Sequence, residues 1–127
     1  MSTDPNRIVV ADDDADIREL VQFKLEQAGF VVDAVEDGGQ AWESIVSAPP
    51  VLAVLDVMMP GLSGLDVLRK VREDEATRDV PVILLTARSR DSDVDSGFTS
   101  GATDYVIKPF SPRELVHRVS SVVGRRT

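Results

Sequence analysis

Short apolar runs and longer stretches with helical spacing alternate along this chain. A continuous apolar run bounded by turn residues predicts a strand buried on both faces, as in a parallel sheet covered by helices. The clearest run, residues 51–55, lies between Pro50 and Pro60 and stops at the carboxylate of Asp56. The strands expected on this pattern cover residues 7–11, 30–35, 51–55, 80–86 and 104–108.

The connections between these strands carry apolar residues at helical spacing, which predicts helices. Asp14 is interpreted as a residue of the first helix's N-terminus, where the helix dipole favours a negative charge. Gly29 is placed to end that helix, because glycine readily adopts the left-handed conformation found there. Asp37 and Gln40 begin the second helix in an arrangement close to a capping box. Residues 91–100 predict a helix only weakly, since Ser, Asp, Gly and Thr are poor helix formers.

The last helix has the clearest start in the chain. Ser111 is a typical N-cap, Pro112 suits the first helical position, and Glu114 would complete a capping box. Strand and helix therefore alternate five times. Right-handed crossovers turn this order into an α/β fold, a doubly wound five-stranded parallel sheet with five helices on its two faces. With the strand order 2-1-3-4-5, the first and third strands are neighbours at the switch point.

The composition fits one globular domain. A chain of 127 residues is long enough for one core and too short for two. We expect residues 1–6 to be a flexible leader and residues 7–127 to form the domain. No apolar run approaches a membrane span, the start is not a signal peptide, and cysteine is absent, so a cytoplasmic protein is expected. The net charge of -8 argues against direct nucleic-acid binding.

Reactive side chains follow the expected strands at one end. Asp12 and Asp13 come after the first strand and Asp56 after the third, while Thr86 and Lys108 end the fourth and fifth. Parallel strands end at one rim of the sheet, where ligands of such folds bind. Three carboxylates in one pocket repel each other, and a hard divalent cation with oxygen ligands would offset the repulsion. Mg²⁺ suits such a site.

This set of groups suits phosphoryl transfer to a carboxylate nucleophile. Each member has an ordinary interpretation when taken alone. Asp12 and Asp13 could cap a helix, Thr86 could be a common strand residue, and Lys108 could be a surface lysine. The joint pattern, with Asp56 directly after a buried run, favours a functional site.

Four stretches of the chain resemble the receiver (CheY-like) domain of bacterial two-component response regulators: residues 8–13, 55–64, 86–87 and 104–110. The resemblance covers residues 7–123. It implies a doubly wound fold in which Asp56 accepts a phosphoryl group from a histidine kinase or a phosphotransfer protein. Such a domain signals rather than acting as an enzyme on other molecules, although it catalyses its own phosphorylation and slow dephosphorylation.

The resemblance also implies a Mg²⁺ site. Asp13, Asp56 and the backbone carbonyl of Met58 would be direct ligands, and Asp12 would act through a bound water. Because Mg²⁺ keeps several waters and takes few carboxylates, this set matches its usual coordination.

By the same resemblance, the remaining site residues handle the phosphoryl group and the response to it. Thr86 and Lys108 would hold the phosphoryl oxygens. Tyr105 would change position together with Thr86. The bond between Lys108 and Pro109 is expected to be cis, which proline permits at low cost.

The expected switch changes the surface formed by residues 91–100, the fifth strand and the last helix. Asp104, Glu114 and Arg118 could pair across a two-fold axis there, but Ser96 and Thr103 stand where charged residues are frequent in the family. We therefore expect at most a weak phosphorylation-dependent dimer, since exposed ion pairs contribute little singly. The output is open, whether a stand-alone receiver or a piece of a longer regulator.

Three other classes of protein share parts of the pattern. A phosphatase of the haloacid dehalogenase type needs an acid two residues after the nucleophile, where this chain has Met58. A flavodoxin-like carrier needs a phosphate-cradling loop, and the carboxylates of residues 12–14 would repel a flavin phosphate. A degenerate receiver would have lost site residues, and none is missing here.

Overall fold

The computed structural model describes residues 5–87 and 101–124. The helix expected at residues 91–100, Ser96 and most of the expected leader lie outside the described residues. Strands and helices alternate as the sequence predicted through residue 87, and a further strand and helix follow from residue 104. The strands are β1 (Arg7–Ala11), β2 (Val31–Val35), β3 (Leu52–Asp56), β4 (Val82–Ala87) and β5 (Asp104–Lys108). The helices are α1 (Ala15–Gln27), α2 (Gly38–Ser47), α3 (Gly64–Glu73) and α5 (Pro112–Gly124).

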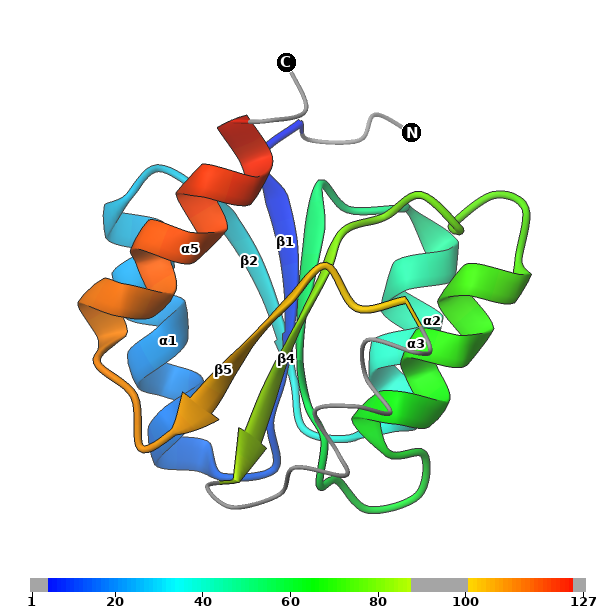
Figure 1. The fold of residues 1–127 in the computed structure, drawn as a ribbon, viewed down its shortest axis with the longest axis horizontal. Helices are drawn as coiled ribbons and strands as arrows, with labels where there is room; N and C mark the ends of the chain where they lie inside the picture. Colours follow the sequence, from blue (N-terminus) through cyan, green and yellow to red (C-terminus); the bar gives the residue numbers. More distant parts are fainter. Residues whose placement is uncertain (1–4, 88–100, 125–127) are drawn as a thin grey trace.

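The five strands form one parallel sheet in the order β2-β1-β3-β4-β5. This confirms the predicted fold class and strand order. Helices α1 and α5 cover one face of the sheet, and α2 and α3 cover the other (Figure 1). The site at the carboxyl ends of the strands therefore lies between two helical layers.

Two apolar cores lie on the two faces of the sheet. Successive residues of a strand point to opposite faces, so Val9 joins the core under α2 and α3 while Ile8 and Val10 join the core under α1 and α5. Strand β3 is buried at all five positions. The edge strand β2 differs from β3 in having no buried position, and Val31 is 48% exposed. An edge strand has only one neighbour, which explains the difference.

The helix starts follow local side-chain chemistry. Asp14 lies at the N-terminus of α1 as predicted, and it is the N-cap: its carboxylate accepts from the backbone N–H groups of Asp16 and Ile17. The Asp37 carboxylate likewise accepts from the N–H of Gln40, at 2.8 Å. These caps satisfy N–H groups that have no partner within the helix.

The capping box predicted at α5 forms only in part. The hydroxyl of Ser111 accepts from the backbone N–H groups of Arg113 and Glu114. The carboxylate of Glu114 instead accepts from the guanidinium of Arg118, at 3.3 Å. A nearby cation is a stronger partner for a carboxylate than a backbone N–H, because the hydrogen bond is charge-assisted on both sides.

Candidate functional site

The strand register brings the carboxyl-terminal residues of four strands to one rim. Ala11, which precedes Asp12, lies beside Leu55 of β3, and Asp56 lies beside Leu85 of β4. On the other side of β4, Ala87 lies beside Lys108. The groups that the sequence singled out at strand ends are therefore close in space.

The carboxylates of Asp12, Asp13 and Asp56 each have an oxygen within 4.8 Å of the others. Asp12 is fully buried, Asp56 is 5% exposed, and Asp13 is exposed. The Lys108 ammonium donates to one oxygen of Asp12 and one of Asp56, both at 3.1 Å. One cation thus bridges two buried carboxylates, while the third carboxylate lies at the mouth of the site.

Burial and neighbouring charges shift the pKa values of Asp56 and Lys108. Loss of solvent and then the nearby charge of Asp12 raise the pKa of Asp56 from 3.8 to about 6, against the opposing pull of Lys108. Burial by itself would lower the pKa of Lys108, but its contacts with Asp56 and Asp12 outweigh burial and raise it. The ammonium is therefore held charged, and the pocket still carries more negative than positive charge.

The hydroxyl of Thr86 is buried and has no hydrogen-bond partner among the described residues. Buried polar groups nearly always have a partner, and leaving one without costs about 1–3 kcal/mol. Thr86 lies at the end of β4, one residue beyond the neighbour of Asp56. A donor or acceptor brought to this rim would satisfy its hydroxyl.

The backbone directly after β3 turns beside Asp56, the expected phosphoacceptor. The backbone N–H of Met58 donates to an oxygen of Asp56 at 3.3 Å, and the Met58 side chain is exposed. The N–H of Val57 continues the ladder to the Leu85 carbonyl. The Met58 backbone therefore lies beside Asp56, while its side chain faces solvent.

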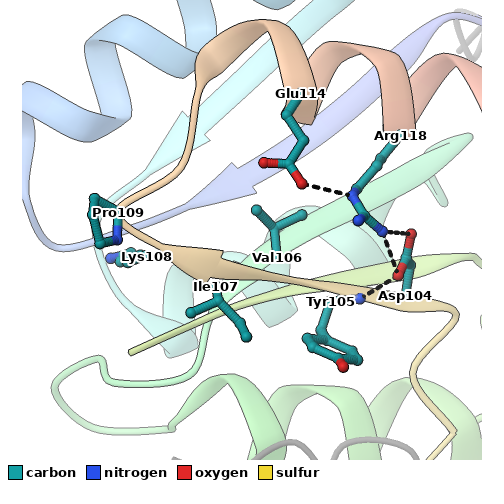
Figure 2. A pocket seen from close by; sticks show the side chains of 8 residues that line it. All are labelled: Asp104, Tyr105, Val106, Ile107, Lys108, Pro109, Glu114 and Arg118. Carbon is teal, nitrogen blue, oxygen red and sulfur yellow. Dashed lines mark hydrogen bonds and ion pairs between the residues drawn. The ribbon is translucent and has the colours of Figure 1, made fainter. Parts of the chain in front are cut away.

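The side chains of β5 point alternately to the two sides of the strand (Figure 2). The side chains of Tyr105 and Ile107 point to one side of the strand, and Val106 points toward α5 on the other. Tyr105 is half-buried and packs against the core under α2 and α3. After Lys108, the peptide bond to Pro109 is cis.

The donor set fits Mg²⁺. Three carboxylates supply hard oxygen ligands within 4.8 Å of one another, and Asp13 is open to water. Mg²⁺ binds through one or two carboxylates and retains waters, so it needs such a partly open site. The surplus of negative charge would be offset by the cation. The carboxylates that could hold it, directly or through a bound water, are Asp12, Asp13 and Asp56.

Two features around the site were missed from the sequence. Ser63 and Asp66 form a complete capping box at the start of α3, directly after the loop that carries Met58. The pattern of a Ser followed three residues later by an Asp was a usable signal for it. Arg18 donates to the backbone carbonyl of Asp12 at 2.8 Å, a contact between α1 and the β1 end that no local pattern announces.

No helix in the described ranges is long and apolar enough to cross a membrane. A doubly wound sheet with a buried aspartate, a bridging lysine and a hydroxyl that has no partner in the described ranges, all at one rim, is suited to accept a phosphoryl group. The model of the response regulator receiver domain matches residues 8–120. The chain belongs to this family, and it is a phosphoacceptor domain of two-component signalling.

Curated relatives support the assignment. The chain is 44% identical over 118 residues to the phosphate regulon transcriptional regulatory protein PhoB of Pseudomonas aeruginosa, covering 93% of this chain and 52% of PhoB. It is 42% identical over 123 residues to the transcriptional regulatory protein ResD of Bacillus subtilis, covering 97% and 50%. The DNA-binding response regulator MtrA of Mycobacterium tuberculosis is 42% identical, over 98% and 54%. The chain spans about half the length of these relatives.

Solved structures share the fold over almost the whole chain. The receiver domain of a Francisella response regulator has a TM-score of 0.88 and 34% identity, with 96% of this chain and 99% of that chain covered. The chemotaxis protein CheY4 of Vibrio cholerae has a TM-score of 0.86 and 28% identity, over 94% and 99%.

Proposed function

We propose that Asp56 is the phosphoacceptor and that the groups around it divide the work of phosphoryl transfer. The observation that carries this proposal is the Lys108 ammonium at 3.1 Å from both Asp12 and Asp56, at the rim where a third carboxylate also lies. An oxygen of Asp56 forms a bond to phosphorus as the bond from phosphorus to the donor's histidine nitrogen breaks. The fixed positive charge beside Asp56 lowers the barrier, since this chemistry depends mainly on positioning and electrostatics.

Mg²⁺ would be held by Asp13, Asp56 and the Met58 carbonyl, with Asp12 acting through a water. When bound, the cation supplies positive charge to the transferring oxygens. Lys108 and the Thr86 hydroxyl would hold the phosphoryl oxygens that the cation does not contact. The buried hydroxyl of Thr86 supports this role, because it has no partner among residues 5–87 and 101–124 and a phosphoryl oxygen would give it an acceptor.

The response to phosphorylation involves Thr86 and Tyr105. Movement of the Thr86 hydroxyl toward the phosphoryl group opens space beside β5, and Tyr105 turns into it. Tyr105 is half-buried on the neighbouring strand, two positions before the partner of Thr86 in register, which supports the coupling. The changed surface includes β5 and α5.

The phosphodonor is a sensor histidine kinase or a phosphotransfer protein, and its docking surface lies beside the site. Ile17, Leu20, Phe110 and the Lys108–Pro109 turn line an apolar hollow of about 340 Å³. Leu20 is 44% exposed there. A partner helix seated in this hollow would bring its histidine to the rim that carries Asp56, in the cytoplasm where such kinases present it.

The output lies outside this domain. MtrA is a DNA-binding response regulator and PhoB a transcriptional regulatory protein, and the chain matches about half of each. We infer that an output domain or a separate protein reads the switched surface. The net charge of -8 argues against direct nucleic-acid binding by this domain.

Phosphorylation gives at most a weak dimer of the isolated domain. A groove of about 500 Å³ runs along β5 beside Glu114 and Arg118 (Figure 2). Arg118 already pairs within the chain, to both oxygens of Asp104 at 3.0 and 3.1 Å. Pairing across a two-fold axis would have to replace these bonds. Sedimentation of the phosphorylated domain should show mostly monomer at low micromolar concentration, and a tight dimer would contradict this.

Intact mass tests the central assignment. The purified domain, given Mg²⁺ and a small phosphodonor such as acetyl phosphate, should gain the mass of one phosphoryl group. Asp56→Asn should gain none, and Asp16→Asn, an exposed aspartate on α1, should react like the unsubstituted protein. Equal phosphate incorporation by Asp56→Asn would refute the assignment.

A further inference from the structure

The β3–α3 connection, residues 57–63, carries the Met58 backbone that lies against Asp56. Two glycines, each the first residue of a helix, contact its ends. Gly64 begins α3, and Gly38 begins α2. Both are buried. The position of this connection is therefore set from two sides by helix starts without side chains.

Gly64 packs directly on the phosphoacceptor's own backbone. A methyl group at Gly64 would lie 2.3 Å from the carbonyl oxygen of Asp56 and 3.0 Å from Cα of Val57. The Gly64 N–H also donates to the Val57 carbonyl at 3.0 Å. Since non-bonded heavy atoms need more than 3 Å, only glycine fits at this contact.

Gly38 makes the corresponding contact at the other end of the connection. A methyl group there would lie 1.9 Å from the carbonyl oxygen of Leu62 and 2.7 Å from its Cβ. Gly38 is not among the glycines with positive φ, which are Gly29, Gly61 and Gly101 in the described residues. The backbone conformation at Gly38 is therefore open to any residue, and the requirement for glycine is the contact alone.

The next residue provides the contrast. Gly39 lies in the same helical turn and is exposed, and a methyl group there would meet only Asp37 Oδ1, at 3.5 Å, an ordinary contact. Gly38 and Gly39 thus have the same helix propensity, but only Gly38 lies so close to the β3–α3 connection that a side chain would clash with it.

We propose that Gly38 is a positioning residue for the phosphoryl-transfer site. Its bare Cα lets the first turn of α2 rest on the Leu62 carbonyl, which fixes the β3–α3 connection and, through it, the Met58 backbone beside Asp56. This inference rests on the proposed function of Asp56 and adds a residue on α2 that contacts neither phosphate nor metal. A side chain at position 38 displaces Leu62, and the displacement travels four residues back to Met58 and two residues on to Gly64.

The site is sensitive to such a displacement for a physical reason. Mg²⁺ demands near-ideal octahedral geometry, so a shifted backbone ligand weakens its binding. A misplacement of about 1 Å at a reacting centre can reduce a rate on the order of 100-fold. The loss should therefore appear both in metal affinity and in phosphorylation rate.

Gly38→Ala and Gly39→Ala form a matched pair of variants. Mg²⁺ affinity is measured from Trp42 fluorescence or amide chemical shifts, phosphorylation rate from intact mass, and folded fraction from circular dichroism. Gly38→Ala should bind Mg²⁺ about tenfold more weakly and react on the order of 100-fold more slowly, at a fully folded signal. Gly39→Ala should match the unsubstituted protein in both and unfold at a higher urea concentration, because alanine favours helix.

If Gly38→Ala does not fold, a second pair decides. Asp37→Ala removes the cap that holds the first turn of α2, while Asp37→Asn removes the same charge and keeps a capping side chain. A loosened α2 start should weaken Mg²⁺ binding several-fold in Asp37→Ala relative to Asp37→Asn. Equal affinities in the two would overturn the proposal.

The outcomes separate this inference from the proposed function. If the unsubstituted protein gains no phosphoryl group, the assignment of Asp56 fails. If it does react, and folded Gly38→Ala matches Gly39→Ala in Mg²⁺ affinity and rate, only the positioning role of Gly38 fails. A selective loss in Gly38→Ala supports both.

Discussion

Two clusters of charged side chains lie at the two ends of β1 and differ in how well their groups are satisfied. At the amino end, the Arg7 guanidinium donates to the Asp33 carboxylate and to the backbone carbonyls of Ser44 and Ala48 at the end of α2. The Ser44 hydroxyl also bonds to Asp33. One cation here meets one carboxylate, and its other hydrogen bonds go to the end of α2 and its C-cap.

At the carboxyl end, the balance is different. One ammonium, that of Lys108, meets two buried carboxylates while a third lies close by, and the Thr86 hydroxyl has no partner among the described residues. The polar and charged groups of a ligand site do not all have partners while the ligand is absent. The groups of a structural cluster can all find partners within the protein. The comparison separates the two roles: the Arg7 cluster holds the fold, and the Lys108 cluster is left short of positive charge and of one hydrogen bond.

Lys108→Met should have the largest effect and should act on chemistry. The phosphorylation rate of the folded protein is expected to fall on the order of 100- to 1000-fold, as when a preorganised donor to a developing charge is removed. Time-resolved intact mass would measure it. Lys70→Met, an exposed lysine on α3, is the control with the same charge change. Similar phosphorylation rates in Lys108→Met and Lys70→Met would contradict the functional role given to the Lys108 cluster.

Arg7→Met should act on the fold alone. Losing the hydrogen bonds to Asp33, Ser44 and Ala48 should lower the free energy of unfolding by about 2–3 kcal/mol, measured in urea. Phosphorylation rate and Mg²⁺ affinity should stay unchanged. Arg69→Met removes an exposed pair with Asp66 and should cost less than about 1 kcal/mol. A slowed reaction in folded Arg7→Met would show that the two ends are coupled.

Asp13→Ala should sharpen the assignment of the metal. Because Asp13 is a proposed direct ligand, Mg²⁺ affinity should fall at least about tenfold, since even residues that only orient ligands contribute that much. Titration followed by Trp42 fluorescence or amide shifts would measure it. Asp16→Ala makes the same change in net charge at an exposed residue in the first turn of α1. It should leave the Mg²⁺ affinity unchanged. Loss of affinity in both would indicate a general effect of charge.

Asp56→Asn should stabilise the metal-free fold, the smallest effect of the four. The folded pKa of about 6 exceeds the ordinary 3.8, so the ionised carboxylate is disfavoured in the fold above that range. A pKa unit corresponds to about 1.4 kcal/mol, and screening reduces the sum, so we expect about 1–2 kcal/mol at pH 8. The gain should shrink as pH falls through 6 and vanish below 3.8, where both states are protonated.

Urea unfolding with a chelator, at pH 8 and pH 4, would measure the gain. Asp66→Asn provides the opposite case, because the N–H of Ser63 lowers the pKa of Asp66 and thereby favours its ionised form in the fold. Its substitution should not stabilise at either pH. Destabilisation by Asp56→Asn at pH 8 would contradict the charge imbalance that distinguishes the site.

Much of the fold followed from local patterns. The apolar run before Asp56 predicted a fully buried strand, and alternation of strands with helices predicted the doubly wound sheet, since few topologies accept that order. Boundaries were less accurate: the second strand begins at Val31 rather than at residue 30, and the fourth extends to Ala87. Strand ends depend on pairing with neighbours that lie far away in the sequence, so local pattern places them only within a residue or two.

The sequence by itself determined which chemical groups end the strands, because each group follows its own strand in the chain. Only the tertiary structure decided how those groups share protons, charge and hydrogen bonds. That Lys108 bridges Asp12 and Asp56, and that Thr86 has no hydrogen-bond partner within the described part of the chain, depends on strand register and on the packing of β4 between β3 and β5. The role of Gly38 depends on a contact between α2 and a connection more than twenty residues further on. Such distances are set by packing across the sheet, and no local pattern of residues carries them.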